Sequence, residues 1–236
     1  MFRSVPLYRE RWALSGRTDP VVVPGRPGIH SGAIKKEDVL RRLVDLVPLA
    51  GGTESVDPQR GLGAALSVRF PLRRGAFVTV LDKTDVLPPS DLPRGVTGCV
   101  LDLPSGPAES AWLALTAALR RGVPVIAVGV DKRLAELAAE LPEELAVRLD
   151  AVPVRTMREL DAGPYGLLHD PLLGYLGSLR QCGRWHLDWR RVYARETDAG
   201  IAMTVLSQRS PALVDILVGP GSLDRCPRHG TPVVLP

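Results

Sequence analysis

The sequence predicts a three-layer α/β fold with a mostly parallel sheet, flanked by a less regular N-terminal arm and C-terminal region. Two observations support this prediction. Between residues 77 and 150, apolar runs of strand length alternate with helical patterns of about 10 to 15 residues, as in right-handed βαβ units. Four of these runs stop on an aspartate, at 78–82, 98–102, 126–131 and 146–150.

The predicted α/β core covers residues 34–150 and carries a sheet of the Rossmann or flavodoxin type. Its first helix is expected over 34–49, where apolar residues recur with a helical period. Strands are expected to end at 82, 102, 131 and 150, with helices over 107–121 and 132–141. The 82–95 connection lacks room for a helix and contains Pro88 and Pro89, so an antiparallel first strand pair stays open.

Irregular segments flank this core. Residues 1–33 contain Pro20, Pro24 and Pro27 around the apolar run 21–23, which predicts an extended arm with one edge strand. Residues 151–236 complete the same domain or form a small appendage, with strand-like runs at 201–206 and 212–218. Both flanks are also candidates for contacts in a homo-oligomer or a larger assembly.

Composition narrows the protein class. With 236 residues the chain can bury a full core, and its three cysteines are too few for a disulfide framework. We find no apolar stretch long enough for a signal peptide or a membrane span, so a cytoplasmic protein is expected. The net charge of +4 gives only a slight preference for anionic partners.

The strand-end aspartates form the first candidate site. Asp82, Asp102 and Asp131 would share the carboxyl edge of a parallel sheet, where open α/β folds bind their ligands. Carboxylates there suit a divalent cation, a hydroxyl group or general-base chemistry, whereas the alternative is that each caps the following helix. The turn at Ser105 and Gly106 precedes a helix start that favours an anion, and Glu109 is a candidate acid or base in its first turn.

These residues predict an enzyme that binds a phosphorylated or nucleotide-like small molecule at the strand ends and uses Asp and Glu for acid–base chemistry. The alternative is a non-catalytic module that binds nucleic acid or protein. It rests on residues 180–195, which hold five arginines, one aspartate and the aromatic residues Trp185, Trp189 and Tyr193. On a helix, Arg184 and Arg191 would lie in one basic stripe facing phosphates.

A second candidate site has the ligands of a metal. Cys182 and His186 are four residues apart, as on one face of a helix, and Cys226 and His229 form a compact second pair. Together they supply the four soft ligands of a closed structural zinc site. The alternatives are a buried thiol with surface histidines, or pairing of Cys182 with Cys226.

Overall fold

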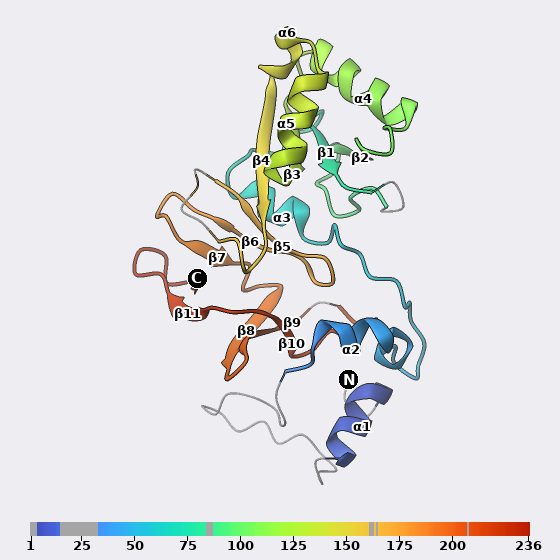
Figure 1. The fold of residues 1–236 in the computed structure, drawn as a ribbon, viewed down its shortest axis with the longest axis vertical. Coiled ribbons are helices and arrows are strands. Elements are labelled where there is room, and N and C mark those ends of the chain that lie inside the picture. The colour runs from blue at the N-terminus through green and yellow to red at the C-terminus, as the bar shows by residue number, and fades with distance from the viewer. Residues whose placement is uncertain (1–3, 15–32, 84–86, 161–162, 164, 207) are drawn as a thin grey trace. The chain divides into compact units, whose positions relative to one another are not determined.

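The computed structural model describes residues 4–14, 33–83, 87–160, 163, 165–206 and 208–236, and shows an α/β protein with a large mixed sheet and a separate antiparallel sheet (Figure 1). It divides into two compact units. We call Asp57–Trp185 the α/β unit, and Met1–Val56 with His186–Pro236 the terminal unit. In the described residues, every helix is too short or too polar to cross a membrane.

Parallel strands form most of the sheet in the α/β unit. Its strands run in the order β2-β1-β3-β4-β5-β6, and every neighbouring pair from β2 to β5 is parallel, whereas β5 and β6 are antiparallel. β1 lies inside this sheet and all five of its residues are buried, as expected for a strand covered on both faces. The strands are β1 (Phe77–Leu81), β2 (Thr97–Leu101), β3 (Val125–Gly129), β4 (Leu149–Arg155), β5 (Leu167–Asp170) and β6 (Gly174–Leu179).

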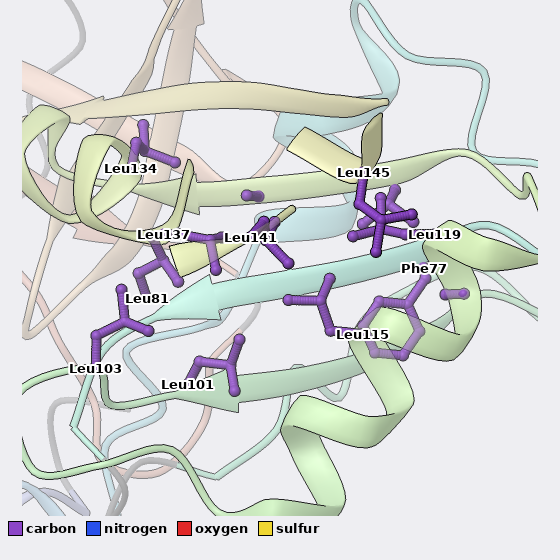
Figure 2. Close-up of a cluster of buried hydrophobic side chains, with 13 residues drawn as sticks. Phe77, Leu81, Leu101, Leu103, Leu115, Leu119, Leu134, Leu137, Leu141 and Leu145 are labelled. Carbon is purple, nitrogen blue, oxygen red and sulfur yellow. The ribbon is translucent and has the colours of Figure 1, made fainter. Parts of the chain in front are cut away.

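Helices pack on both faces of this sheet. Successive strand residues point to opposite sides, so each buried strand offers apolar side chains to both faces. On one face, Phe77 and Leu81 of β1 pack with leucines of α4 (Glu109–Arg120), α5 (Asp131–Glu140) and α6 (Glu143–Ala146). Figure 2 shows these leucine side chains gathered over the strands. On the other face, Val78 and Val80 pack with Leu62 and Leu66 of α3 (Leu62–Ser67). The predicted α/β class is therefore confirmed, with a mixed sheet whose first half is mostly parallel.

The structure corrects two predictions for this region. Asp150 does not end a strand: it is the second residue of β4 and pairs with Ile126, near the amino ends of these strands. The apolar run that suggested a strand spans the end of α6, a turn and the start of β4. The antiparallel option for the first pair is also wrong, since β1 and β2 are parallel although the described residues of their connection contain no helix.

The terminal unit contains an antiparallel sheet and a hairpin. Three strands run in the order β10-β9-β8, and β11 pairs with β12. Tyr8 is buried in α1, and its hydroxyl donates to the Ala212 carbonyl at 2.9 Å and accepts from the Val214 N–H at 2.8 Å. The elements are α1 (Pro6–Leu14), α2 (Lys36–Arg41), the 3-10 helix η1 (Leu43–Leu46), β8 (Val192–Thr197), β9 (Gly200–Val205), β10 (Ile216–Gly219), β11 (Ser222–Arg225) and β12 (Pro232–Leu235).

Two predicted elements in this unit differ from the structure. Residues 6–14 form α1 rather than an extended arm, with Pro6 at the first helical position, where its missing N–H costs nothing. The edge strand predicted at 21–23 lies outside the described residues. The helix predicted over 34–49 is present as α2 followed by η1, and the runs at 201–206 and 212–218 correspond approximately to β9 and β10.

Candidate metal centre

The structure brings Cys182, His186, Cys226 and His229 together. Each offers one ligand atom, and these four atoms all lie within 4.8 Å of one another. The two pairs are about forty residues apart in the sequence, so only the tertiary fold can place them in one cluster. His186 and Cys226 are each only 1% exposed, Cys182 is half-buried and His229 is exposed.

The first pair lies on a turn and a strand, so the predicted helix over residues 180–195 is wrong. Cys182 belongs to the turn after β6, and His186 is the central residue of β7 (Trp185–Leu187), where the unit boundary falls. Gly183 has a φ of +72°, which suits glycine and breaks a helix, and its N–H donates to the Arg180 carbonyl at 2.8 Å. The turn closes with the Arg180 N–H donating to the Arg184 carbonyl at 3.1 Å.

The second pair lies in the tight connection between β11 and β12. The Gly230 N–H donates to the Cys226 carbonyl at 2.7 Å, and the Cys226 N–H donates to the Thr231 carbonyl at 2.9 Å. Gly230 has a φ of +66°, so the turn needs the freedom of glycine there. This turn holds the Cys226 Sγ 3.4 Å from the His229 Nδ1.

The distances fit tetrahedral coordination. With Zn–S of about 2.3 Å and Zn–N of about 2.0 Å, a sulfur and a nitrogen on one tetrahedron are about 3.5 Å apart. The Cys226 to His229 separation of 3.4 Å matches that edge. The bound of 4.8 Å exceeds the longest such edge, about 3.8 Å between two sulfurs, by about 1 Å. Small side-chain rotations would close that difference.

A hydroxyl group fixes the orientation of one histidine. The His186 Nδ1 lies 2.7 Å from the Thr231 Oγ1, so Nε2 is the ring nitrogen that would coordinate a metal. Metal-binding histidines characteristically form such a bond through the nitrogen that does not coordinate. The rings of His186 and His229 meet edge to face with centroids 4.9 Å apart. Thr231 was not among the residues predicted for this site.

The predicted strand-end aspartates occupy one edge, but each has a partner there. Asp82, Asp102 and Asp131 follow the carboxyl ends of the adjacent strands β1, β2 and β3. The Asp131 carboxylate pairs with Arg155 at 2.9 Å. Asp102 is buried and accepts the Ser105 N–H at 3.5 Å. Neither Asp102 nor Asp131 is a helix N-cap, because those positions are Ala108 and Val130, so the capping alternative is wrong for both.

The turn after Asp102 is exposed. Ser105 and Gly106 lie in it, and Gly106 has a φ of +85° with its N–H donating to the Leu103 carbonyl at 3.3 Å. Glu109 is the first residue of α4 and is exposed. A carboxylate in the first turn of a helix interacts favourably with the helix dipole, so this position of Glu109 can be explained without a catalytic role.

Sequence reasoning missed a buried polar network next to Asp82. Gln59 is 1% exposed, and its amide nitrogen lies 3.5 Å from the Asp82 Oδ2, while the Tyr175 hydroxyl lies 3.4 Å from its amide oxygen. Burial raises the pKa of Tyr175, and the carboxylates of Asp82 and Asp91 raise it further. The Tyr175 ring packs against His169, whose Nε2 lies 2.8 Å from the Pro58 carbonyl. Gln59 lies in a turn outside the predicted helices and strands, so no local pattern marked it as a candidate.

The basic segment is largely engaged with the protein itself. Arg191 forms an ion pair with Asp188 at 3.6 Å, and Arg195 is held by Asp215 through two bonds of 2.7 Å. Arg184 is half-buried in the turn before β7, with its carbonyl used in that turn. The basic stripe expected from a helix is therefore absent from these strands and turns.

No protein-family model matches this sequence, and a search of curated proteins found no match either.

Proposed function

We propose that this protein binds one structural zinc ion through Cys182, His186, Cys226 and His229. The observation that carries the proposal is the convergence of four soft ligand atoms within 4.8 Å. Two thiolates and two imidazoles are a ligand set typical of zinc. The two thiolate charges cancel the charge of Zn²⁺, so the site can be buried without leaving a net charge in the protein interior.

The number of ligands argues for a structural role. Four protein ligands fill the tetrahedron of zinc, whereas catalytic zinc sites keep one position for water or substrate. The centre joins β7, through His186, to the turn of the β11–β12 hairpin. β11 and β12 have only four residues each, and β12 is also the sheet neighbour of β7, so the centre lies at the end of a short hairpin that is already paired with that strand. The metal would fix that turn in place.

Metal analysis of the purified protein tests this proposal. The protein is prepared without chelator under reducing conditions, and the zinc content per chain is measured by inductively coupled plasma mass spectrometry. One zinc per chain is expected, and Cys226→Ser should lose it. Cys99→Ser is the matched control, because Cys99 lies on β2 outside the cluster and should leave the zinc content unchanged. A zinc content that Cys226→Ser does not lower would refute the proposal.

A second function concerns the strand edge, and the strand order favours it. The parallel order β2-β1-β3-β4-β5 is that of flavodoxin-like sheets, which bind ligands outside β1 and β3, where the strand order reverses. Asp82 and Asp131 follow those two strands. We propose that a phosphorylated or nucleotide-like small molecule binds there, with Asp82 and Asp102 as contacts to hydroxyl groups or a cation and Glu109 as acid or base.

Thermal shift measurements with nucleotides and sugar phosphates, with and without Mg²⁺, test this second function. A stabilising ligand whose effect is lost in Asp82→Ala and kept in Glu140→Ala would support it. Glu140 is a suitable control because it lies at the opposite end of α5 from Asp131 and is exposed. A ligand effect that persists in Asp82→Ala would contradict it. Binding of nucleic acid by residues 180–195 has less support, because Arg191 and Arg195 are paired with carboxylates.

A further inference from the structure

The two cysteines of the candidate metal centre differ in their access to solvent. Cys182 is half-buried on the turn after β6, between the exposed residues Gln181 and Gly183, whereas Cys226 is only 1% exposed. A small oxidant in solution would therefore reach the Cys182 sulfur first. The Cys226 sulfur lies within 4.8 Å of it, close enough to react with the product.

Space is open beside Gly183 in the turn that carries Cys182. A disulfide needs its sulfurs about 2.05 Å apart, so the two Sγ atoms would have to approach by at most about 2.8 Å. Gly183 stands next to Cys182, and a side chain added to it would meet nothing within 4 Å. Rotation of the Cys182 side chain and a small shift of this turn can supply the approach, while the hydrogen bonds to Thr231 and Gly230 hold the Cys226 turn.

We propose that this zinc centre is a redox switch, in which a peroxide oxidises Cys182 and Cys226 to a disulfide and releases the zinc. The inference rests on the proposed zinc binding. The Cys182 thiolate attacks one peroxide oxygen, which breaks the O–O bond, forms a sulfenic acid and, for hydrogen peroxide, releases hydroxide. The Cys226 thiolate then attacks the Cys182 sulfur, forms the S–S bond and displaces a second hydroxide.

Atoms and electrons balance over these two steps. The two thiolates lose two electrons in total, and hydrogen peroxide gains them and leaves as two hydroxide ions, which protons from the solvent convert to water. Two of the four metal ligands are consumed, so the remaining histidines, His186 and His229, hold zinc too weakly to retain it. A thiol reductant reverses the chemistry by restoring both thiolates.

The third cysteine provides an internal comparison. Cys99 is half-buried in β2, its Sγ lies 3.5 Å from the Thr79 Oγ1, and burial raises its pKa. Because the thiolate is the reactive form, a raised pKa makes Cys99 a poor target for peroxide. Oxidation is therefore directed to the metal centre, and Cys99→Ser should not change the response.

Treatment of the zinc-loaded full chain with hydrogen peroxide tests the switch. A chromophoric chelator follows zinc release, and peptide mapping without reductant identifies the sulfur products. We expect release of one zinc per chain with a Cys182–Cys226 cross-linked peptide, followed by zinc rebinding after reduction. Cys99→Ser should give the same result.

Two other outcomes distinguish failure of the redox switch from failure of the zinc site. Zinc that stays bound during oxidation, or leaves without the Cys182–Cys226 link, would overturn the switch while the structural zinc site stands. Reduced protein that holds no zinc before any peroxide is added would overturn the zinc site itself, and the switch with it.

Discussion

Replacement of Thr231 by valine tests the geometry of the zinc centre most sharply. Valine keeps the shape of threonine but removes the hydroxyl that lies 2.7 Å from the His186 Nδ1. His186 is 1% exposed, so water cannot easily take the place of that hydroxyl. Outer partners of metal-binding histidines are typically worth about 10-fold to 100-fold in metal affinity, or about 1.4 to 2.7 kcal/mol. We expect zinc to bind Thr231→Val more weakly by that factor.

The assay is a competition between the protein and a chromophoric chelator of known affinity. The backbone carbonyl of Thr231 accepts the Cys226 N–H, and this bond does not depend on the side chain. The turn should therefore keep its shape in the variant, which should still bind one zinc per chain. Thr231→Ser restores a hydroxyl and should recover most of the lost affinity. Unchanged zinc affinity in Thr231→Val would refute the reasoning that this hydroxyl orients His186.

Three further predictions concern stability. Removal of zinc by a chelator should lower the melting temperature by about 5 to 10 °C relative to protein at a free zinc concentration 100 times its Kd, because binding then adds about 2.7 kcal/mol. Tyr8→Phe should cost about 1 to 3 kcal/mol in denaturant unfolding, since the buried Val214 N–H loses its acceptor. Gly174→Ala should cost more than about 2 kcal/mol, because its φ is +80° and the new Cβ would clash with the Arg60 carbonyl oxygen. Gly122→Ala, with a φ of +70° and open space, is the control and should cost only about 1 kcal/mol.

Local patterns predicted the centre of the fold well. The apolar runs that end near Asp82, Asp102 and Asp131 are strands, and the helical patterns that follow Asp102 and Asp131 are α4 and α5. Each of these elements buries a face whose period is visible over one short stretch of sequence. Asp150 was misplaced because its apolar run joins the last residues of a helix to the first of a strand. Periodicity over so few residues does not distinguish the two.

The candidate metal centre shows a different limit of sequence reasoning. The ligand types and the spacing within each pair were sufficient to select Cys182, His186, Cys226 and His229, and the structure brings them together. The predicted helix for Cys182 and His186 was wrong. Their spacing of four residues suits a helix, but in the structure the two residues lie on a turn and a strand. Gly183 was the available signal, since glycine weakens a helix and permits the positive φ that the turn uses. Thr231 could not be found from spacing alone, because its hydroxyl acts on His186, 45 residues away.

The two candidate sites differ in how closely their side chains match the needs of one ligand. At the strand edge, Asp131 has Arg155 as a counter-ion and Asp82 has the Gln59 amide, so both carboxylates are stable without a ligand. In the cluster, the bond between Cys226 and His229 joins a sulfur to an imidazole nitrogen at 3.4 Å, and sulfur is a weak hydrogen-bonding partner. Coordination of zinc by such ligands contributes about 10 kcal/mol or more in small zinc domains. The four ligand atoms of the cluster lie within 4.8 Å of one another and are of the types that zinc prefers, whereas the strand-edge carboxylates do not converge on one point, and for this reason zinc stands ahead of the strand edge as the first function to test.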